Sequence, residues 1–460
     1  MTSFFVENFG CRATQADGAA IERRFQERGL VRAGTPAQAE IVVLNSCTVT
    51  AAADQDARSA IRRIRRENPA CQIVVTGCYA QRAPQEVASL PGVSRVIGNS
   101  HKHQLVEIVA DSLPPKALAN VGTQTGFVSL SSLTANVQSQ VFVSDIFAHT
   151  ELLAAPVFDH TGHGADHNRT RPNLKVQDGC DNRCSFCVIP YVRGQSRSLP
   201  LNQILAEVNA LVDWGYREVV ISGINLGRWG RDLLAQGLYF EDLIRAILSR
   251  TSLEKLRISS VEPMDWSDEL IDLVARSPRI AKHAHVPLQS GSDRVLRAMH
   301  RKYRPWHYRE KLGKLRAAMP TAAIGADVMV GFPGETKADF EETRLLIEEL
   351  PITYLHVFTY SPRPGTPAAA MRIQVPVQIA RERNRILRDL GAEKKLEFMR
   401  SFAGNTVEAI TLDAFDGEST EALTDNYLKV RLTGQHEANR WLKVQVKQIA
   451  DGTLIATLLV

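Results

Sequence analysis

The sequence contains no long hydrophobic run. Its apolar stretches, such as residues 41–44 and 73–75, have the length of single strands. None approaches the roughly 18 consecutive apolar residues of a membrane-spanning helix, which argues against a membrane protein. The first five residues also lack the charged segment and apolar core of a signal peptide, so we expect a cytoplasmic protein with no membrane partner.

A strong charge imbalance is missing as well. The 460-residue chain has 55 Lys and Arg against 50 Asp and Glu, a net charge of +5. This mild basicity permits a nucleic-acid partner without requiring one. Cysteine is scarce, and its count of seven is odd. Without an export signal, this count argues against a disulfide framework and directs attention to where the cysteines lie.

Strand-like and helix-like segments alternate between residues 1 and 121. This alternation predicts a first domain with an open parallel α/β sheet. Its expected strands are 4–8, 41–45, 73–76 and 93–98, and its expected helices are 16–28, 52–66 and 84–90.

Residues 122–170 are polar and show little periodicity, which predicts a linker or an insertion. Four histidines lie there, at positions 149, 160, 163 and 167. A metal site is conceivable, but no cysteine or carboxylate falls at a ligand-like spacing, so we favour a solvated polar segment.

Alternation resumes in residues 171–397 and predicts six βα units, a partial (β/α)6 barrel. The expected strands are 173–177, 218–222, 255–259, 284–287, 325–330 and 354–360. A long charged helix at 376–400 precedes a last domain, residues 398–460, with short strand-like runs at 406–412, 427–432 and 442–449. We expect that last domain to be a small β-barrel, and the whole chain to be of the α/β class.

Cys180, Cys184 and Cys187 follow directly on the first predicted barrel strand. Three thiolates in one loop can bind three irons of a [4Fe-4S] cluster and leave the fourth iron open to a chelating small molecule. The alternative is a zinc site completed by a distant histidine. Zinc sites more often use paired CxxC units, and no second pair is present here.

Cys11, Cys47 and Cys78 each lie at the end of a predicted strand, behind a small residue. Because the carboxyl ends of parallel strands meet at one sheet edge, we expect these three thiolates to converge there. They predict a second [4Fe-4S] cluster with an open iron, although buried cysteines are often simple packing residues. Cys71 begins its strand at the opposite edge, so we assign it to packing.

The spacing CxxxCxxC, with Phe186 before the last cysteine, resembles the signature of the radical S-adenosylmethionine (SAM) superfamily. The resemblance implies that SAM chelates the open iron and that an electron from the cluster cleaves it to a 5′-deoxyadenosyl radical. Cys180, Cys184 and Cys187 would then be the catalytic residues. The fold implied is a partial (β/α)6 barrel, in agreement with the six strand signals.

With both cysteine sets, nearly the whole chain resembles the methylthiotransferases, whose C-terminal domain is of the TRAM type. The segments PLQSGS at 287–292 and YSPRPGTP at 360–367 are similar to the branches that act on tRNA. Four further segments resemble the enzymes that act on N6-threonylcarbamoyladenosine: NSCTVT at 45–50, GCYAQ at 77–81, KVQDGC at 175–180 and GINLG at 223–227.

The resemblance implies conversion of that nucleoside, at position 37 beside the anticodon, to its 2-methylthio derivative. One SAM would methylate a sulfur at the first cysteine set, and a second would supply the radical. The implied partners are the tRNA anticodon loop and an electron donor protein such as a flavodoxin or ferredoxin. SAM contacts are expected at the carboxyl ends of barrel strands, where each residue is equally open to a structural role: Gly223, Asn225, Ser259, Ser260, Glu262, Gln289 and Ser290.

One departure from the family keeps alternatives open. Residues 401–460 contain five Lys and Arg against eight Asp and Glu, a difference of −3 that suits phosphate binding poorly. Arginines gather instead at 58–66 and 294–309, and we expect those at 58–66 and 294–304 to carry part of the phosphate contact. The alternatives are a methylthiotransferase acting on isopentenyladenosine in tRNA or on an aspartate of a ribosomal protein, and, outside enzymes, a metal- or redox-sensing RNA-binding protein.

Overall fold

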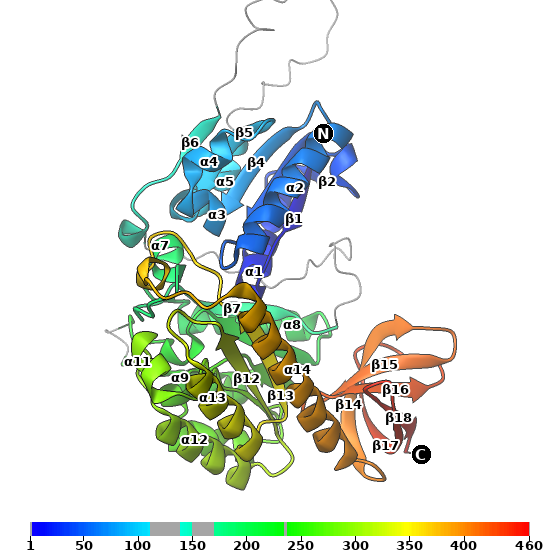
Figure 1. Ribbon diagram of the computed structural model, residues 1–460. Coiled ribbons are helices and arrows are strands. Elements are labelled where there is room, and N and C mark those ends of the chain that lie inside the picture. Colours follow the sequence, from blue (N-terminus) through cyan, green and yellow to red (C-terminus); the bar gives the residue numbers. More distant parts are fainter. Residues whose placement is uncertain (1, 111–138, 150–169, 234–236, 460) are drawn as a thin grey trace, which may run out of the picture. The chain divides into compact units, whose positions relative to one another are not determined.

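The computed structural model of the protein describes residues 2–110, 139–149, 170–233 and 237–459 (Figure 1). By its contacts the chain divides into two compact units. The first unit comprises Met1–Leu153 and the short segment Tyr191–Arg193, and the second comprises Ala154–Pro190 and Gly194–Val460. Within the described ranges, no helix combines the length and apolarity needed to span a membrane. The domain boundaries at 121, 170 and 397 stay predictions.

The first unit contains a six-stranded parallel sheet in the order β2-β1-β3-β4-β5-β6. The predicted parallel α/β sheet is therefore confirmed. Its strands are β1 (Ser3–Asn8), β2 (Val31–Arg32), β3 (Ile41–Ser46), β4 (Gln72–Gly77), β5 (Val93–Gly98) and β6 (Gln140–Phe142).

Strand β6 lies within residues 122–170, predicted as a linker or an insertion, and pairs with β5 at Arg95, Val96 and Ile97. A three-residue edge strand is too short to leave a periodic signal in the sequence. The histidines at 160, 163 and 167 lie outside the described residues. His149 is described, and its ring stacks on that of His103, with centroids 5.2 Å apart.

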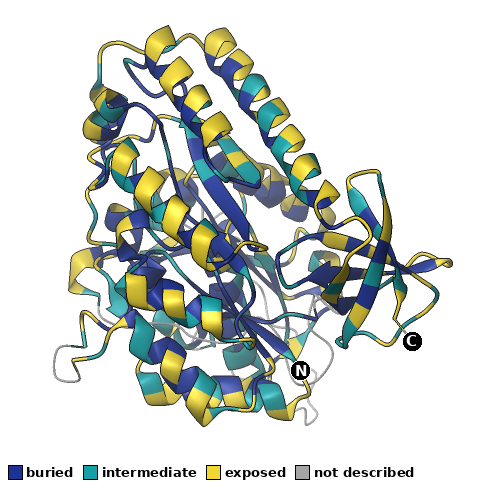
Figure 2. Cartoon of the chain, turned by 90° about the horizontal axis from the view of Figure 1, so that it is seen from below, coloured by how far each residue is buried: buried dark blue, intermediate teal, exposed yellow. Residues whose placement is uncertain are grey.

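Amphipathic helices cover this sheet. In α2 (Ala51–Glu67), Ala57, Ile61 and Ile64 are buried, and the Thr50 side chain caps the helix by accepting from the Ala53 N–H. Figure 2 shows the resulting pattern of buried and exposed helix faces. The other helices are α1 (Arg12–Glu27), α3 (Cys78–Arg82), α4 (Pro84–Ala88) and α5 (Leu105–Ala110), with 3-10 turns η1 (Pro36–Gln38), η2 (Asn99–Gln104) and η3 (Ile146–Ala148).

The second unit contains the six predicted parallel barrel strands in two sheets. An isolated parallel bridge between Ser260 and His285 connects the two sheets. The strands are β7 (Asn173–Asp178), β9 (Glu218–Gly223), β10 (Lys255–Ile258), β11 (His283–His285), β12 (Ala323–Val330) and β13 (Tyr354–Thr359), with a short antiparallel strand β8 (Arg197–Ser198) beside β7.

Helices alternate with these strands, as Figure 1 shows. They are α7 (Ile189–Arg193), α8 (Leu201–Asp213), α9 (Phe240–Arg250), α10 (Asp268–Arg276), α11 (Asp293–Ala298), α12 (Pro305–Ala318), α13 (Lys337–Glu349) and α14 (Val377–Arg400). The 3-10 turns are η4 (Leu226–Arg228), η5 (Pro263–Asp265) and η6 (Pro367–Ala370). The strand–helix alternation follows the expected barrel pattern.

A closed five-stranded barrel ends the chain, which confirms the predicted β module. Met399 and Phe402 at the end of α14 pack into its core. A turn of this barrel contacts the start of the parallel strands: Arg257 of β10 donates to the carbonyls of Asp425 (2.9 Å) and Thr424 (3.2 Å). The strands are β14 (Thr406–Phe415), β15 (Ser419–Thr424), β16 (Lys429–Thr433), β17 (Trp441–Ala450) and β18 (Thr453–Leu458).

Candidate functional site

The barrel cysteines lie in the loop that leaves β7. Gly179 opens this loop at φ +71°, and a Cβ there would lie 1.8 Å from the Gln195 carbonyl oxygen, so only glycine fits. The Cys180 N–H donates to the Gly194 carbonyl at 3.0 Å, and the Cys187 N–H donates to the Cys184 carbonyl at 3.1 Å. Backbone hydrogen bonds therefore fix the loop that presents the sulfurs.

Burial and mutual repulsion shape the chemistry of these thiols. Burial, followed by the neighbouring Cys184 and Cys180, raises the pKa of Cys187 to about 12. Burial likewise raises the pKa of Cys180. Such thiols stay protonated at neutral pH until a cation replaces the proton. Arg301 donates to the Cys184 sulfur at 3.2 Å.

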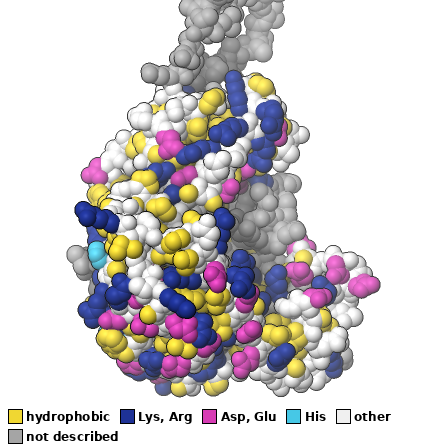
Figure 3. All heavy atoms as spheres, in the orientation of Figure 1, with side chains coloured by type: hydrophobic (Ala, Val, Ile, Leu, Met, Phe, Trp, Pro, Cys, Tyr) yellow, Lys and Arg dark blue, Asp and Glu magenta, His cyan; other side chains and the backbone are white. Residues whose placement is uncertain are grey.

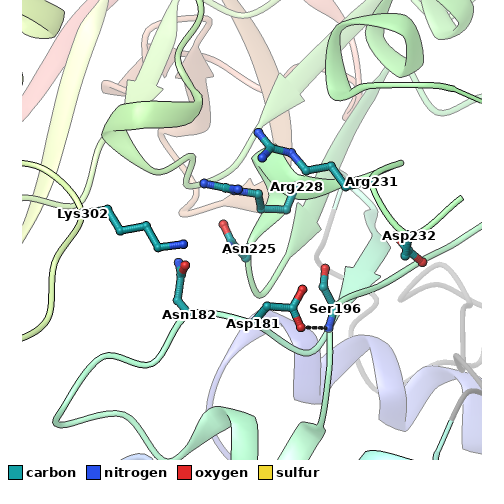
Figure 4. Close-up of a pocket in the computed structure, with 8 residues that line it drawn as sticks. All are labelled: Asp181, Asn182, Ser196, Asn225, Arg228, Arg231, Asp232 and Lys302. Carbon is teal, nitrogen blue, oxygen red and sulfur yellow. Dashed lines mark hydrogen bonds between the residues drawn. The ribbon is translucent and has the colours of Figure 1, made fainter. Parts of the chain in front are cut away.

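A pocket of about 140 Å³ opens beside this loop (Figure 4). Lys302 and Arg228 extend toward Asn225 from different sides. The Asn225 amide N lies 3.6 Å from the Cys180 sulfur, while its buried Oδ1 has no hydrogen-bond partner among the described residues. The pocket therefore offers three cationic side chains and an orphaned acceptor, which match the carboxylate and amino groups of an amino acid; Arg228 and Arg231 also pair with Asp265. It is lined by Asp181, Asn182, Ser196, Asn225, Arg228, Arg231, Asp232 and Lys302.

The other expected SAM contacts occupy different surroundings. Gly223 ends β9, and a Cβ there would lie 2.8 Å from the Gln177 side-chain oxygen. The Gln177 oxygen accepts from the Asn225 N–H at 2.7 Å. Ser259, which follows β10, donates its N–H to the Ile221 carbonyl, and Ser260 is exposed.

Glu262, Gln289 and Ser290 complete the expected set. Glu262 forms an ion pair with the buried Arg301. Gln289 has the left-handed φ of 64°, which holds its side chain at a bend after β11. Ser290 is 1% exposed, and its hydroxyl lies 3.2 Å from that of Thr343, a contact that favours a structural role. The SAM-contact assignments stay predictions.

The N-terminal cysteines lie at the carboxyl ends of β1, β3 and β4, as the strand pattern required. A Cβ on Gly10 would lie 2.8 Å from the Cys47 sulfur, so this glycine lets the Cys11 loop approach Cys47. Burial, then Cys78 and Cys11, raise the pKa of Cys47 to about 12. The three thiols therefore lie close enough to affect one another. Cys71 lies at the other end of β4, where burial raises its pKa.

Buried polar groups surround this triad. Asn99 donates to the Val192 carbonyl at 2.7 Å, and the same amide nitrogen lies 3.6 Å from the Cys78 sulfur. Its buried Oδ1 has no hydrogen-bond partner within the described ranges. A donor on a bound group would satisfy this acceptor.

A buried ion network lies in the same unit. Asp17 accepts from Lys102 at 3.0 Å and from Arg193 at 3.1 Å, and all three residues are at most 5% exposed. Lys102 also donates to Asn45 Oδ1 at 3.2 Å. Burial lowers the pKa of Lys102, and Arg193 lowers the pKa of Cys47. Arg193 therefore partly offsets the effect of burial on the pKa of Cys47, although burial outweighs it.

Neither cysteine triad has the tight spacing of a single-ion site. Among the described residues, three metal-binding donor atoms lie within 4.8 Å of one another only at His285, Asp327 and His356. A cubane distributes three sulfur ligands over three separate irons, so it suits a wider arrangement than zinc, whose Zn–S bonds are about 2.3 Å.

Most arginines of the second basic stretch are engaged within the unit. Arg294 donates to Asp339 at 3.1 Å, and Arg309 pairs with Glu349 at 2.7 Å. Arg301 is 7% exposed, so the expectation that it contacts phosphate is wrong. Figure 3 shows Lys and Arg side chains over α2 and acidic side chains on the C-terminal barrel. Helix α2 therefore offers more exposed cations for phosphate binding than the second basic stretch does.

Comparisons with known proteins identify the family. The Radical SAM superfamily matches residues 174–347, and the family described as Uncharacterized protein family UPF0004 matches residues 3–98. A threonylcarbamoyladenosine tRNA methylthiotransferase MtaB from Aquifex aeolicus is 34% identical over 440 residues, covering 96% of this chain and 99% of the relative. The chain belongs to the radical SAM methylthiotransferase family. Membership makes it an enzyme that uses SAM and a [4Fe-4S] cluster.

Other family members are almost as similar. The MtaB protein of Bacillus subtilis is 35% identical, covering 95% of this chain and 92% of the relative. A tRNA-2-methylthio-N(6)-dimethylallyladenosine synthase from Novosphingobium aromaticivorans is 33% identical, covering 89% and 86%. Among solved structures, the radical SAM methyltransferase TsrM from Kitasatospora setae superposes with a TM-score of 0.55, covering 80% of this chain and 75% of its own. Its 15% identity supports the fold alone.

Several residues in or near these sites escaped the sequence analysis. Arg228 lies five residues after the predicted Gly223, and Lys302 stood in a stretch interpreted as a phosphate-binding face. Lys102 and Arg193 gave no signal because nothing in the sequence marks a lone cation as buried. His283 and His285 did leave a signal in the sequence, because the pattern His-Ala-His in a strand places two histidines on one face.

Proposed function

We propose that this enzyme converts N6-threonylcarbamoyladenosine at position 37 of tRNA to its 2-methylthio derivative. The observation that carries the proposal is the similarity to MtaB proteins over 95% or more of the chain. The dimethylallyladenosine synthases reach comparable identity but cover less of it, 89% in the case cited. The anticodon loop of tRNA, an electron donor such as a flavodoxin or ferredoxin, and a cytoplasmic location belong to the same proposal.

In the barrel, Cys180, Cys184 and Cys187 would hold the [4Fe-4S] cluster. Bound there, the cluster and SAM supply a 5′-deoxyadenosyl radical, which suits an adenine C–H that has no acidic proton. Arg228 and Lys302 would bind the methionine carboxylate of SAM, and Asn225 Oδ1 would accept from its amino group. Arg301 would hold the Cys184 sulfur in place through its hydrogen bond.

At the N-terminal sheet edge, Cys11, Cys47 and Cys78 would hold a second [4Fe-4S] cluster. A cluster held there would carry on its open iron the sulfur that is methylated and transferred. Arg193, which donates to Asp17, would favour the thiolate form of Cys47 at this edge. Asn99 would orient the Cys78 sulfur through its amide.

The test uses anaerobically reconstituted enzyme, SAM, a chemical reductant and two anticodon stem-loops. One RNA carries N6-threonylcarbamoyladenosine at position 37, and the other carries isopentenyladenosine. We expect a methylthio mass increase on the first RNA at a kcat/KM at least tenfold above the second. Faster modification of the isopentenyl RNA, or of neither RNA, contradicts the proposal.

A further inference from the structure

One face of β11, β12 and β13 is polar. In register, His285 lies beside Gly325, which lies beside Tyr354, and the next level pairs Asp327 with His356. Residues two apart in a strand share a face, so these side chains lie together. On the other face of β12, Ile324, Ala326 and Val328 are fully buried, as expected where helices cover a barrel.

This polar face looks into the barrel lumen. Tyr427 packs against His283 of β11 and Tyr354 of β13, with ring centroids 5.0 and 6.1 Å away. The guanidinium of Arg257 in β10 also lies over this ring, 5.6 Å from its centroid. Side chains from three strands can meet one ring only on the inner side of the barrel. Tyr427 therefore closes one end of the lumen, below the histidines.

The polar groups form a connected cluster. Asp327 Oδ1 lies 3.0 Å from His285 Nε2 and 3.3 Å from His356 Nδ1. The Tyr354 hydroxyl lies 2.7 Å from His283 Nε2 and 3.0 Å from His285 Nδ1. Burial opposes ionisation of Asp327, but hydrogen bonds from both histidines outweigh it and hold its pKa well below the usual range.

The cluster is accessible on one side. Side-chain exposure rises from 7% at His285 to 23% at Asp327 and 52% at His356. Both histidines contact the same carboxylate oxygen of Asp327, so a donor on a ligand can approach the other oxygen. None of these groups is needed for holding a cysteine-bound cluster or for the pocket around Asn225.

We propose that Asp327 and His356, supported by His285 and Tyr354, bind the polar N6 substituent of the substrate adenosine. The proposal rests on the proposed function, because a threonylcarbamoyl group carries urea N–H donors, a hydroxyl and a carboxylate. Asp327 accepts from a urea N–H, and Nε2 of His356, whose Nδ1 donates to Asp327, accepts from the hydroxyl. An isopentenyl group would leave both unpaired, which discriminates strongly against it.

The experiment compares Asp327→Asn and His356→Leu with a matched control, Thr359→Leu. Thr359 is exposed on the opposite face of β13. Its replacement by leucine therefore shows the effect of a substitution in this strand that leaves the lumen unchanged. Fluorescence anisotropy measures binding of stem-loops that carry either N6-threonylcarbamoyladenosine or plain adenosine at position 37. SAM cleavage without RNA and metal content report whether the rest of the site is intact.

We expect each lumen variant to weaken binding of the threonylcarbamoyl RNA by about 10- to 100-fold, the loss typical of a hydrogen bond to a charged group. Binding of the unmodified RNA, SAM cleavage and the control should be unchanged. Retention of the wild-type preference in both variants overturns the subsite. So does a stoichiometric divalent metal that both variants lose, because the cluster would then be a metal site. A wild-type enzyme that modifies only isopentenyl RNA refutes the proposed function instead.

Discussion

At the scale of single residues, the environment of each cysteine distinguishes ligand from packing residue. Burial and neighbouring thiols raise the pKa values of Cys47 and Cys187 to about 12. Cys71 is buried alone, and no other thiol contributes to its shift. Grouped thiols that cannot ionise without a cation are suited to metal, whereas a solitary buried thiol behaves as a small hydrophobic residue.

The two triads should be separable by substitution. Replacing Cys180, Cys184 and Cys187 by Ala should remove about four of the roughly eight irons and abolish SAM cleavage. Replacing Cys11, Cys47 and Cys78 should remove the other four, leave SAM cleavage largely intact and abolish sulfur transfer. Iron analysis and 5′-deoxyadenosine formation measure both outcomes.

Cys71→Ala is the matched control for these variants. It should retain all the iron and lose at most some packing stability. Iron loss in this variant as large as in the triple variants would refute the assignment of the sheet edge.

Asp17 is the counter-charge of a buried cation pair. Asp17→Asn leaves Lys102 and Arg193 without this carboxylate, and breaking a buried ion pair of this kind costs about 3–5 kcal/mol. Urea unfolding should show a large fall in midpoint. Arg23→Ala removes an exposed pair with Glu27 and should leave the midpoint unchanged. Equal effects of the two substitutions would contradict the buried network.

At the scale of elements, the start of α13 shows how one carboxylate organises a junction. Thr336 and Asp339 form a reciprocal cap, in which the Asp339 N–H donates to the Thr336 hydroxyl at 3.2 Å. Asp339 also accepts from Arg294 at 3.1 Å and from Ser292 at 2.7 Å. Burial opposes ionisation, but these donors hold the pKa of Asp339 well below its usual range.

Asp339→Asn should lower stability by about 2–3 kcal/mol at pH 7, since charge-assisted hydrogen bonds are lost. Because the pKa is depressed in the folded state, this contribution is complete above the ordinary carboxyl value of about 3.9 and fades as pH falls below it. The difference in urea midpoint between wild type and variant should therefore be larger at pH 7 than at pH 3.5. Glu341→Gln, which removes only a surface ion pair with Arg344, should have a small effect at either pH. A constant difference for Asp339→Asn would refute the cap.

The elements that follow a repeated strand–helix pattern could be predicted from the sequence, whereas short strands and contacts between residues distant in sequence could not. The cysteine-bearing edge could be predicted because three strands end in the same pattern, and parallel strands meet at one edge. Strand β6 could not be predicted, because three residues are too few to show an alternating pattern. Arg301 was expected on the surface, because its burial depends on Glu262 and Cys184, which are distant in sequence. The cluster of His285, Asp327 and His356 depends on strand register across three strands, which a single sequence does not specify.

At the scale of the whole molecule, charge distribution should govern tRNA binding. Arg62 and Arg66 on α2 are exposed, while the C-terminal barrel carries an excess of acidic residues. Arg62→Glu with Arg66→Glu should weaken tRNA binding and flatten its dependence on salt, because fewer counterions are released. Lys443→Glu with Lys447→Glu on the C-terminal barrel is the matched control. A stronger effect of the control pair would assign phosphate binding to that barrel.

The most direct test of the proposed activity is nucleoside mass spectrometry of tRNA from a strain that lacks this gene. We expect 2-methylthio-N6-threonylcarbamoyladenosine to disappear and N6-threonylcarbamoyladenosine to accumulate. The wild-type gene should restore the methylthio nucleoside, whereas variants lacking Cys47 or Cys184 should not. Unchanged levels of this nucleoside, or loss of the methylthio isopentenyl nucleoside in its place, would contradict the proposed function.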